Sequence, residues 1–533
     1  MKKNKIKINY IISILITIFF IVGLKSFNDY GISIDEKFHR ENGLSQYNYI
    51  KNFFSDSNDK KFIEKLENNI KNKTHFDNVP SIQPSFFDLI SEFCIDIFDI
   101  KSIDKIFKFK HLFNYFIFCL SLIFFFKIIY KRYSSKFLAT ISSLGLFLHP
   151  RILSNSFYNQ KDIFFMSIFI IFSFFFLKYL DNQKNKYVFI LSVLFAILFV
   201  TRIFSILILF LFLIFSFLYF KDLSVKLYKH FLSFIAFSFL IIFLFWPYLW
   251  SNPVNNFIFG IKELISYSPS YTILFEGNYI SSKIVPVYYY LKWIIITSPI
   301  FYIVLLSVGI ILFSKKLYQD EINFNKKKNF TFDTFLLSIF FSIICLTIVS
   351  KKGYNGWRHI YFLAPIIIYF FSYAIKEFMS SKNRLFKNLI YFLIIICFTQ
   401  NINWLVKNHP YGNVYFNELI NDENKKKFEL DYWGLSNFNS IKYILEQDNS
   451  NLIEIGTLSF TSLPTTKLIF NKKEFSRIKI LSYKKKPKYL IDNKNNNFKK
   501  NLNVLKDYEL YNEIKINNLI INSIYKKNEK LHN

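Results

Sequence analysis

The chain has 533 residues, of which 52% are hydrophobic and 21% aromatic, and its 67 Lys and Arg against 37 Asp and Glu give a formal net charge of +30. The 70 Phe residues gather in long apolar runs and Gly and Pro number only 12 each, which excludes an ordinary soluble domain. Lys, Asn, Ile, Phe and Tyr are abundant together, as AT-rich codon usage produces, so we attribute the charge to composition and expect no nucleic-acid partner.

The apolar runs predict an all-α polytopic membrane protein with about eleven transmembrane helices. Lys2, Lys3, Lys5 and Lys7 precede the first run, which lacks a small-residue cleavage site and is expected to be an uncleaved signal anchor. The predicted spans cover residues 8–26, 111–130, 136–150, 162–180, 187–201, 203–220, 231–249, 286–313, 333–350, 359–378 and 388–406. We expect a membrane domain over 1–406 and a separate domain over 407–533.

The distribution of basic residues predicts the orientation of these spans. Lys and Arg concentrate in every second loop, at 127–136, 184–186, 221–229, 315–328 and 382–387. We therefore expect a multi-pass protein of the bacterial inner membrane with a cytoplasmic N-terminus and a periplasmic C-terminus. The sizeable segments on the outer side are then 27–110, 250–285 and 407–533.

Two of these outer segments carry structural patterns of their own. Apolar residues at helical spacing around 86–93 are too few to span a membrane and predict interfacial helices within 27–110. The last segment combines a helix-like stretch at 436–447 with β-rich runs at 452–460, 478–482, 489–491 and 519–524, which predicts a small α/β domain.

Several chemistries are not supported by the sequence. The four cysteines lie in apolar stretches and none forms a C-x-x-C pair, so we expect neither a disulfide framework nor a zinc or redox site. There is no P-loop and no G-x-G-x-x-G, which excludes a pump driven by its own nucleotide-binding domain. Any energy must arrive with the substrate.

An acidic pair, Asp35-Glu36, follows the first span within residues 31–39. Carboxylates next to an apolar surface can have raised pKa values suited to base catalysis. An ordinary solvated loop would contain the same dipeptide, so the pair by itself leaves both interpretations open.

Basic residues also lie at the predicted outer ends of later spans. His149, Arg151, Lys161 and Asp162 share one loop, where the two cations either snorkel at the interface or bind a phosphate or carboxylate ligand. Arg202 lies between apolar residues, as a functional residue within the membrane or as the outer turn of a helical hairpin.

Trp357, Arg358 and His359 form a further cluster at the start of a later span. The four clusters come from loops far apart in sequence, and we expect them to converge on a cavity for an anionic, phosphate-like headgroup. Aromatic residues at the same boundary belong either to the membrane aromatic belt or to a sugar-stacking surface; they are Trp246, Tyr248, Trp250, Tyr288, Tyr289, Tyr290 and Trp293.

This order of elements resembles the GT-C superfamily of membrane glycosyltransferases, over most of the chain. The resemblance is to the protein O-mannosyltransferase and aminoarabinose transferase family, the glycosyltransferase 39-like proteins, and to a bacterial subgroup of it. It rests on Asp35-Glu36 in the first outer segment and on the stretches Phe-Trp-Pro-Tyr-Leu-Trp-Ser-Asn-Pro at 245–253, Gly-Trp-Arg-His-Ile-Tyr-Phe at 356–362, 409–418 and 428–435.

The resemblance implies inverting transfer of a hexosyl or pentosyl group from a polyprenyl-phosphate donor to a lipid, glycan or protein acceptor on the periplasmic side. It implies no cofactor and no essential metal. Asp35 is then the catalytic base, supported by Glu36. Fixed cations in a partly dry site stabilise the charge that develops on the leaving phosphate. We expect Arg358 to be the main ligand of the donor phosphate, and Lys161, Arg202 and His359 to bind it as well. The expected supporting residues are His149, Arg151, Asp162 and Trp357.

Two other classes of function remain open at this stage. A transporter or flippase for a lipid or glycolipid is one, although such proteins often have matched halves with broken helices and acidic residues within the spans, which this sequence lacks. A scaffold that acts through the C-terminal domain is the other, and it leaves the cation clusters without a role.

Overall fold

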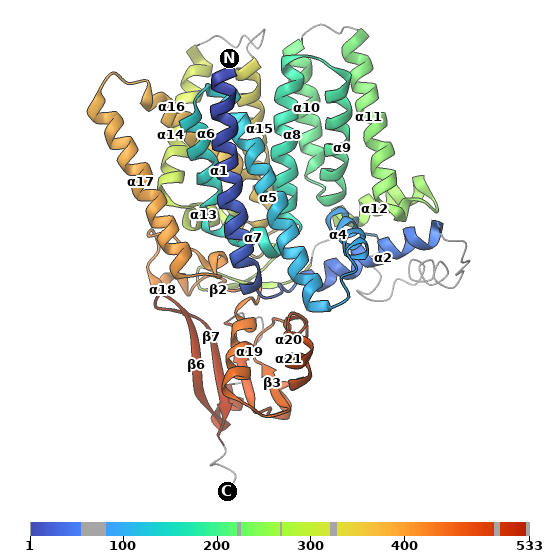
Figure 1. Cartoon of the computed structure of the whole chain (residues 1–533), viewed down its shortest axis with the longest axis vertical. Coiled ribbons are helices and arrows are strands. Elements are labelled where there is room, and N and C mark those ends of the chain that lie inside the picture. The colour runs from blue at the N-terminus through green and yellow to red at the C-terminus, as the bar shows by residue number, and fades with distance from the viewer. Residues whose placement is uncertain are drawn as a thin grey trace.

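The computed structural model describes residues 2–54, 82–220, 225–266, 269–319, 328–494 and 502–528. Within these ranges the chain forms a bundle of helices, and a smaller α/β domain is attached to one end of the bundle (Figure 1). The N-terminus lies at the opposite end of the bundle from this domain. A mostly helical membrane protein with a small C-terminal α/β domain is thus confirmed.

Each of the predicted spans corresponds to a helix or a broken helix. The long apolar helices are α1 (Lys2–Ser26), α5 (Ile103–Tyr133), α8 (Asp162–Asp181), α11 (Val225–Phe245), α14 (Ile300–Gln319), α15 (Lys328–Ser350), α16 (Ala364–Met379, with the 3₁₀ turn η4, Arg358–Leu363, before it) and α17 (Arg384–Lys407). Two shorter apolar helices are α9 (Asn185–Thr201) and α10 (Ser205–Phe220).

Prolines break two of the spans. α6 (Lys136–Phe147) and α7 (Pro150–Tyr158) meet at 63°, because Pro150 has no N–H to continue the helical ladder and instead begins a new helix. The predicted span 286–313 is also two helices, α13 (Tyr289–Thr297) and α14, with Ser298-Pro299 between them. The sequence prediction of one continuous helix there is wrong.

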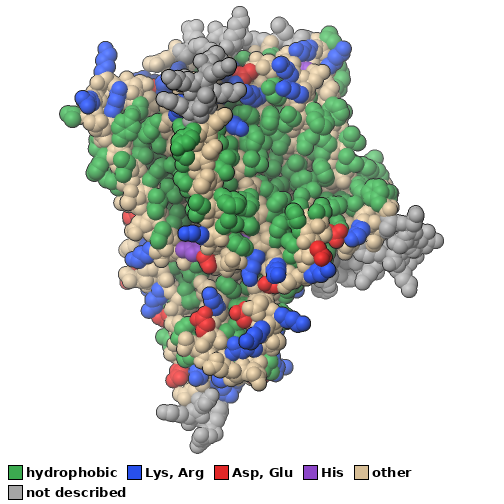
Figure 2. Space-filling view, in the orientation of Figure 1, with side chains coloured by type: hydrophobic (Ala, Val, Ile, Leu, Met, Phe, Trp, Pro, Cys, Tyr) green, Lys and Arg blue, Asp and Glu red, His purple; other side chains and the backbone are tan. Residues whose placement is uncertain are grey.

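The surface of the bundle fits a lipid environment. On the face shown in Figure 2, hydrophobic side chains form a broad band across the helices, and Lys and Arg lie above and below it. Phe210, Phe239 and Ile395 are among the large apolar side chains exposed on α10, α11 and α17. Water does not favour such a surface, so the chain is a multi-pass membrane protein.

Three helices and a hairpin lie near the other end of the bundle, where the α/β domain is attached (Figure 1). The helices are α2 (Glu36–Phe54), α4 (Phe86–Ile97) and α12 (Pro253–Ser266), and the hairpin pairs β1 (Thr272–Phe275) with β2 (Asn278–Ser281). The predicted helix around 86–93 is confirmed, whereas the hairpin was not predicted. Residues 55–81 of the predicted segment 27–110 lie outside the described residues.

The chain after α17 forms the α/β domain, called the tail domain below. Its sheet has the order β4-β3-β5-β7-β6, in which β3 (Ile453–Thr457), β4 (Ile478–Ile480) and β5 (Tyr489–Asp492) are parallel and β7 (Leu519–Lys527) is antiparallel to its neighbours. Helix α19 (Ser436–Gln447) contributes Ile441 and Ile444 to the domain core, which also contains Ile32 and Phe107 from the membrane part. The tail domain is therefore packed onto the bundle.

The predicted helix 436–447 and all four β-rich runs of the tail domain are confirmed as elements. Strand β6 (Tyr508–Ile516) was missed, because Glu509, Asn512, Glu513 and Lys515 give it a polar sequence. It lies at the edge of the sheet, where charged residues are common. Residues 495–501 and 529–533 of the predicted domain, like Lys221 and residues 326–327 of the basic loops, lie outside the described residues.

Candidate functional site

Asp35 lies where the first outer segment meets the segment that follows α17. The Ile34 N–H donates to the carbonyl of Trp433 at 3.1 Å, and Gly31 lies so close to Leu435 and Phe438 that a Cβ there would meet them. These contacts fix the backbone immediately before α2. The Asp35 carboxylate is thereby held at the junction of the bundle and the tail domain.

Asp35 pairs with Arg358, although 323 positions separate them in sequence. Arg358 Nη1 donates to Asp35 Oδ2 at 2.7 Å. The guanidinium also stacks on the rings of Trp433, 4.5 Å from its centroid, and Tyr354, at 5.2 Å. Only 6% of the Arg358 side chain is exposed, whereas Asp35 keeps 35% of its side chain exposed. The carboxylate is therefore partly accessible while its cation is buried, and the accessible surface around Asp35 is called the recess below.

The charge of Asp35 follows from its surroundings. Burial of the carboxyl group favours its neutral form, but the positive charges of Arg358 and, more weakly, Lys161 outweigh this effect and hold the pKa of Asp35 below its ordinary value. His39, one helical turn further along, is kept neutral because burial and the nearby Lys161 lower its pKa to about 4. Asp35 is thus an ionised carboxylate at neutral pH.

Lys161 and Arg202 bring further positive charge to the same place. Arg202 forms an ion pair with Asp162, whose other oxygen accepts a hydrogen bond from Asn159 at 3.1 Å. The Lys161 side chain makes no hydrogen bond or ion pair with any residue in the described ranges. Burial and the neighbouring Arg202 lower the pKa of Lys161 to about 8, while Asp35 and Asp162 oppose the shift. Asp35, Lys161, Arg202 and Arg358 are therefore within electrostatic reach of one another.

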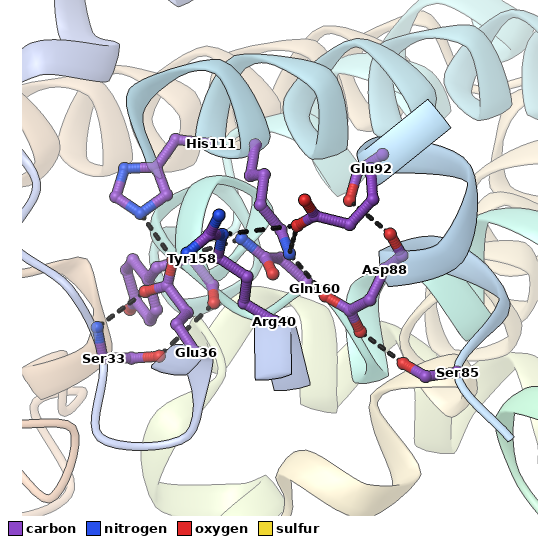
Figure 3. A network of polar contacts seen from close by, with 11 residues as sticks. Ser33, Glu36, Arg40, Ser85, Asp88, Glu92, His111, Tyr158 and Gln160 are labelled. Atoms are coloured by element: carbon purple, nitrogen blue, oxygen red, sulfur yellow. Dashed lines mark hydrogen bonds and ion pairs between the residues drawn. The ribbon is translucent and has the colours of Figure 1, made fainter. Parts of the chain in front are cut away.

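Glu36 plays a different structural part from its neighbour. Oε1 accepts from the Ser33 N–H at 2.6 Å, and Oε2 lies 2.8 Å from His111 Nε2 and accepts from Gln160 Nε2 at 3.1 Å (Figure 3). The side chain is 1% exposed. Because its oxygens are occupied and turned into the protein, Glu36 positions the start of α2 and does not face the recess.

Beside the contacts of Glu36, a network of ion pairs joins α2, α4 and α5 (Figure 3). Arg40 on α2 pairs with Glu92 on α4 at 3.3 Å, and the fully buried Lys110 on α5 pairs with Asp88 on α4 at 2.7 Å. Asp88 also accepts a hydrogen bond from Ser85. Buried charges of this kind are stabilised by their partners, so the network locks α2 against the bundle.

These supporting residues were missed in the sequence. Lys110, His111 and Asn114 are polar residues at the start of an apolar run, which is the signal that could have revealed Lys110 and His111. Asp88 and Glu92 lie on the α4 stretch that was interpreted as an interfacial helix, and Gln160 directly precedes Lys161 in the sequence. No local pattern indicates which partner each residue takes.

Three further predicted residues are His149, Trp357 and His359. His149 Nε2 lies 3.2 Å from the Ser298 hydroxyl, and the Trp357 indole N–H donates to Thr297 Oγ1 at 2.9 Å, so both contact the break between α13 and α14. His359 packs edge-on against Tyr354 with ring centroids 4.6 Å apart. Of these three residues, His359 contacts Tyr354, the ring on which the Arg358 guanidinium stacks.

Arg151 is fully buried, so the interpretation that it snorkels at the interface is wrong. Its Nε donates to the Tyr415 carbonyl at 3.0 Å, and its guanidinium lies 5.2 Å from the ring centroids of both Trp293 and Phe416. Trp246, Tyr289 and Trp293 are also buried, so the aromatic-belt interpretation is wrong for these three.

Glu429 is a further carboxyl group near the recess that was not singled out from the sequence. It accepts a hydrogen bond from the Asn355 N–H at 3.2 Å. Burial raises its pKa to about 8, against the opposing effects of this bond and of Arg358. Glu429 is thus mostly protonated at neutral pH. In the described part of the chain no three His, Cys, Asp or Glu side chains are grouped so as to hold a metal ion.

Comparisons with known proteins were made for sequence and for structure. No family model matches the chain, and no curated protein matches it. Its structure is similar to that of ArnT from Cupriavidus metallidurans bound to undecaprenyl phosphate, with a TM-score of 0.47, 10% identity and 98% of both chains covered.

The structure is also similar to that of an oligosaccharyltransferase from Archaeoglobus fulgidus in the apo form, with a TM-score of 0.45 and 10% identity. That match covers 74% of this chain and 56% of the archaeal chain, so this chain spans just over half the archaeal length. Another similar structure is the Archaeoglobus fulgidus enzyme in complex with an inhibitory peptide and a dolichol-phosphate, with a TM-score of 0.41, 10% identity and coverages of 77% and 61%.

Proposed function

We propose that this protein is a membrane glycosyltransferase that moves a sugar from a polyprenyl-phosphate donor to an acceptor hydroxyl with inversion. The observation that carries the proposal is the ionised, partly exposed Asp35 carboxylate beside Lys161, Arg202 and Arg358. The reaction requires a base because the acceptor hydroxyl loses a proton. It requires cations at the same recess because the leaving group of the donor is a phosphate.

Asp35 acts as the base in this scheme. The acceptor hydroxyl oxygen attacks the anomeric carbon of the sugar, its proton passes to an Asp35 oxygen, and the bond between that carbon and the phosphate oxygen breaks. With its pKa held low, Asp35 is too weak a base to ionise a free alcohol. The hydroxyl becomes acidic as its oxygen bonds to carbon, so the proton moves during the displacement.

The cations act on the leaving phosphate. Lys161, Arg202 and Arg358 together with Asp35 and Asp162 carry one net positive charge, which matches the single negative charge of a sugar phosphodiester. Lys161 has no ion-pair partner in the described ranges, and Arg358 Nε is buried without a hydrogen bond there. These groups gain a partner when a phosphate binds, and they stabilise the charge that its oxygens acquire.

The environment of Glu36 supports a single displacement. A retaining enzyme needs a second carboxylate as a nucleophile, close enough to attack the sugar. Glu36 is bonded to Ser33, His111 and Gln160 and has almost no exposed surface. Of Asp35 and Glu36, only Asp35 keeps exposed surface, and direct attack by the acceptor inverts the anomeric carbon.

The placement of charges supports an outward-facing site. The sequence concentrates Lys and Arg in every second loop between the spans, and the recess lies at the end of the bundle opposite the N-terminus, beside the tail domain (Figure 1). By the positive-inside rule the N-terminus is cytoplasmic, and the recess and the tail domain are periplasmic. The donor then enters from the outer leaflet with its polyprenyl chain in the membrane.

The test is transfer of radiolabelled sugar from synthetic polyprenyl-phosphate donors by membranes that contain the wild type, Asp35→Asn or Glu41→Gln. Glu41 is an exposed carboxylate on α2, the helix that follows Asp35; it is paired with Lys37 and serves as the matched control. We expect label to move with the wild type and Glu41→Gln and to fall at least a hundredfold with Asp35→Asn. Normal transfer by a folded Asp35→Asn protein would refute the role of Asp35, and lipid flux without covalent transfer would indicate a transporter.

A further inference from the structure

A row of aromatic rings connects the tail domain to Arg358. The centroids of Phe460 and Tyr271 are 6.2 Å apart, those of Tyr271 and Tyr354 are 5.3 Å apart, and each pair is packed edge to face. Tyr354 is the ring that carries the Arg358 guanidinium at 5.2 Å, and Arg358 in turn holds Asp35. The row therefore begins on the outside of the tail domain and ends at the candidate base.

The rings come from three separate segments and keep accessible surface. Phe460 follows strand β3, Tyr271 precedes β1, and Tyr354 lies between α15 and η4. Phe460 is 38% exposed, and Tyr271 and Tyr354 are half-buried. Aromatic side chains from separate segments that meet in a row and keep accessible surface form a place where a ligand can cover apolar surface.

Backbone contacts hold the segments in place. The Tyr271 N–H donates to the Ser282 hydroxyl at 2.9 Å, and the Ser282 carbonyl accepts from the Gly353 N–H at 3.0 Å. These bonds connect the start of the hairpin to the loop that carries Tyr354. Next to Phe460, the Thr461 hydroxyl accepts from Asn437 Nδ2 at 2.9 Å. The row is thus a preformed feature that joins the membrane part to the tail domain.

The topology of the tail domain independently points to the same edge. In open sheets with parallel strands, ligands bind outside the carboxyl ends of those strands. Phe460 lies just after the carboxyl end of β3, and β5 ends next to it, where Asn493 N–H and Asp492 Oδ1 both contact the Ser459 hydroxyl. Asn493 also donates to the Asp431 carbonyl at 3.0 Å. This edge of the sheet therefore faces the segment around Trp433 that supports Arg358.

We propose that the row Phe460, Tyr271 and Tyr354 is the binding subsite for a carbohydrate acceptor. The C–H face of a pyranose ring is apolar and packs on an aromatic ring, while its hydroxyl groups bond to neighbouring polar atoms such as Ser459 Oγ. Successive sugars along the row direct the terminal hydroxyl towards Asp35. This assignment of the acceptor class rests on the proposed transferase function.

A carbohydrate fits the row better than a peptide does. A peptide acceptor is held through its backbone, usually by an exposed strand edge. The three segments of the row contribute rings and hydroxyls in place of such an edge, and sugars are recognised by this combination. A peptide at the row is accordingly an outcome that the experiment must be able to detect.

Binding of unlabelled probes to the full chain in detergent tests the subsite without any donor. The probes are maltopentaose, cellopentaose, chitopentaose, mannopentaose and a Ser/Thr-rich peptide, followed by saturation-transfer NMR and titration. The variants are Tyr271→Ala and Phe460→Ala, with Tyr271→Trp to preserve a ring. Tyr279→Ala is the control, because Tyr279 is an exposed tyrosine on the same hairpin and outside the row.

We expect one or more pentasaccharides to bind the wild type and Tyr279→Ala, and to bind Tyr271→Ala and Phe460→Ala at least fivefold more weakly. Tyr271→Trp should bind nearly as well as the wild type. Failure of all four sugars to bind, or binding that the two alanine variants leave unchanged, would overturn the subsite. Binding of the peptide alone, weakened by the same variants, would assign the row to a protein acceptor instead.

The result is separable from the fate of the proposed function. Pentasaccharide binding that depends on the row, without transfer of label from any donor, would leave the subsite standing and refute the transferase. Transfer of label to a non-carbohydrate acceptor, unaffected by Phe460→Ala, would support the transferase and refute the subsite. The donor analogue should bind Phe460→Ala as it binds the wild type, because Phe460 lies at the far end of the row from Lys161.

Discussion

The protonation of Lys161 predicts how donor binding depends on pH. The pKa of Lys161 is lowered to about 8 by burial and by Arg202, so its charged form predominates below pH 8 and is lost as the pH rises through that value. About nine-tenths of the unliganded protein carries this charge at pH 7 and about one-tenth at pH 9. If the phosphate binds the charged form, the apparent Kd rises about tenfold between these two pH values.

The assay is titration of a non-hydrolysable polyprenyl-phosphate sugar into detergent-purified protein from pH 6.5 to 9.5. The analogue is a phosphodiester and does not titrate in this range. Lys161→Arg keeps its charge throughout, so its Kd should vary much less with pH. Because Glu429 also has a pKa of about 8, Glu429→Gln is the second variant and should keep the steep dependence of the wild type.

Two results would refute this reasoning. A tenfold rise that persists in Lys161→Arg would show that another group titrates. Loss of the rise in Glu429→Gln would identify that group as the carboxyl. A separate consequence concerns stability: the folded state disfavours the charged form of Lys161, a penalty present at pH 7 and absent above pH 10.5. Lys161→Met should therefore raise the thermal unfolding midpoint at pH 7 while it weakens donor binding.

Three further variants test the supporting structure. Glu36→Gln turns one acceptor oxygen into an NH₂ that faces a donor. Thermal unfolding should therefore show a loss of about 2 kcal/mol of folding free energy, and sugar transfer should be slower. Wild-type values for both would contradict the positioning role of Glu36. Asp333→Asn breaks the buried pair with Arg132, far from the recess, and should cost about 3–5 kcal/mol of folding free energy without changing the donor Kd. Gly43→Ala places a Cβ 2.4 Å from the Asp88 Cβ, so chemical unfolding should show a loss of about 1–3 kcal/mol, and unchanged stability would mean that α2 and α4 separate easily.

Much of the fold could be predicted because hydrophobicity is a local property. A run of about twenty apolar residues must form its hydrogen bonds internally, so it is helical wherever it lies. The interruption at Ser298-Pro299 was missed because the flanking residues are as apolar as those of a continuous span. The β1–β2 hairpin was missed because its strands are only four residues long and lie in a segment without clear alternation.

The sequence predicted which residues belong to the candidate site better than it predicted their contacts. The sequence placed Asp35, Lys161, Arg202 and Arg358 at the same boundary, and the structure brings them together. Arg358 was expected first of all as a phosphate ligand, yet in the structure its Nη1 holds Asp35. The roles of these residues in catalysis and in donor binding stay predictions until the variants are measured.

The sequence by itself determined that the protein is a multi-pass membrane protein and the order of its apolar segments. Against the predicted eleven spans, the described residues contain eight helices long and apolar enough to cross a membrane, or nine if α6 and α7 form one span. Only the tertiary structure decided that Asp35 faces the recess while its neighbour Glu36 is buried, and that Arg358 is the partner of Asp35. The physical reason is that burial in lipid adds up along a contiguous segment, whereas an ion pair depends on where two distant segments meet. Two adjacent carboxylates look alike in a sequence, and only their surroundings leave Asp35 partly exposed and bury Glu36.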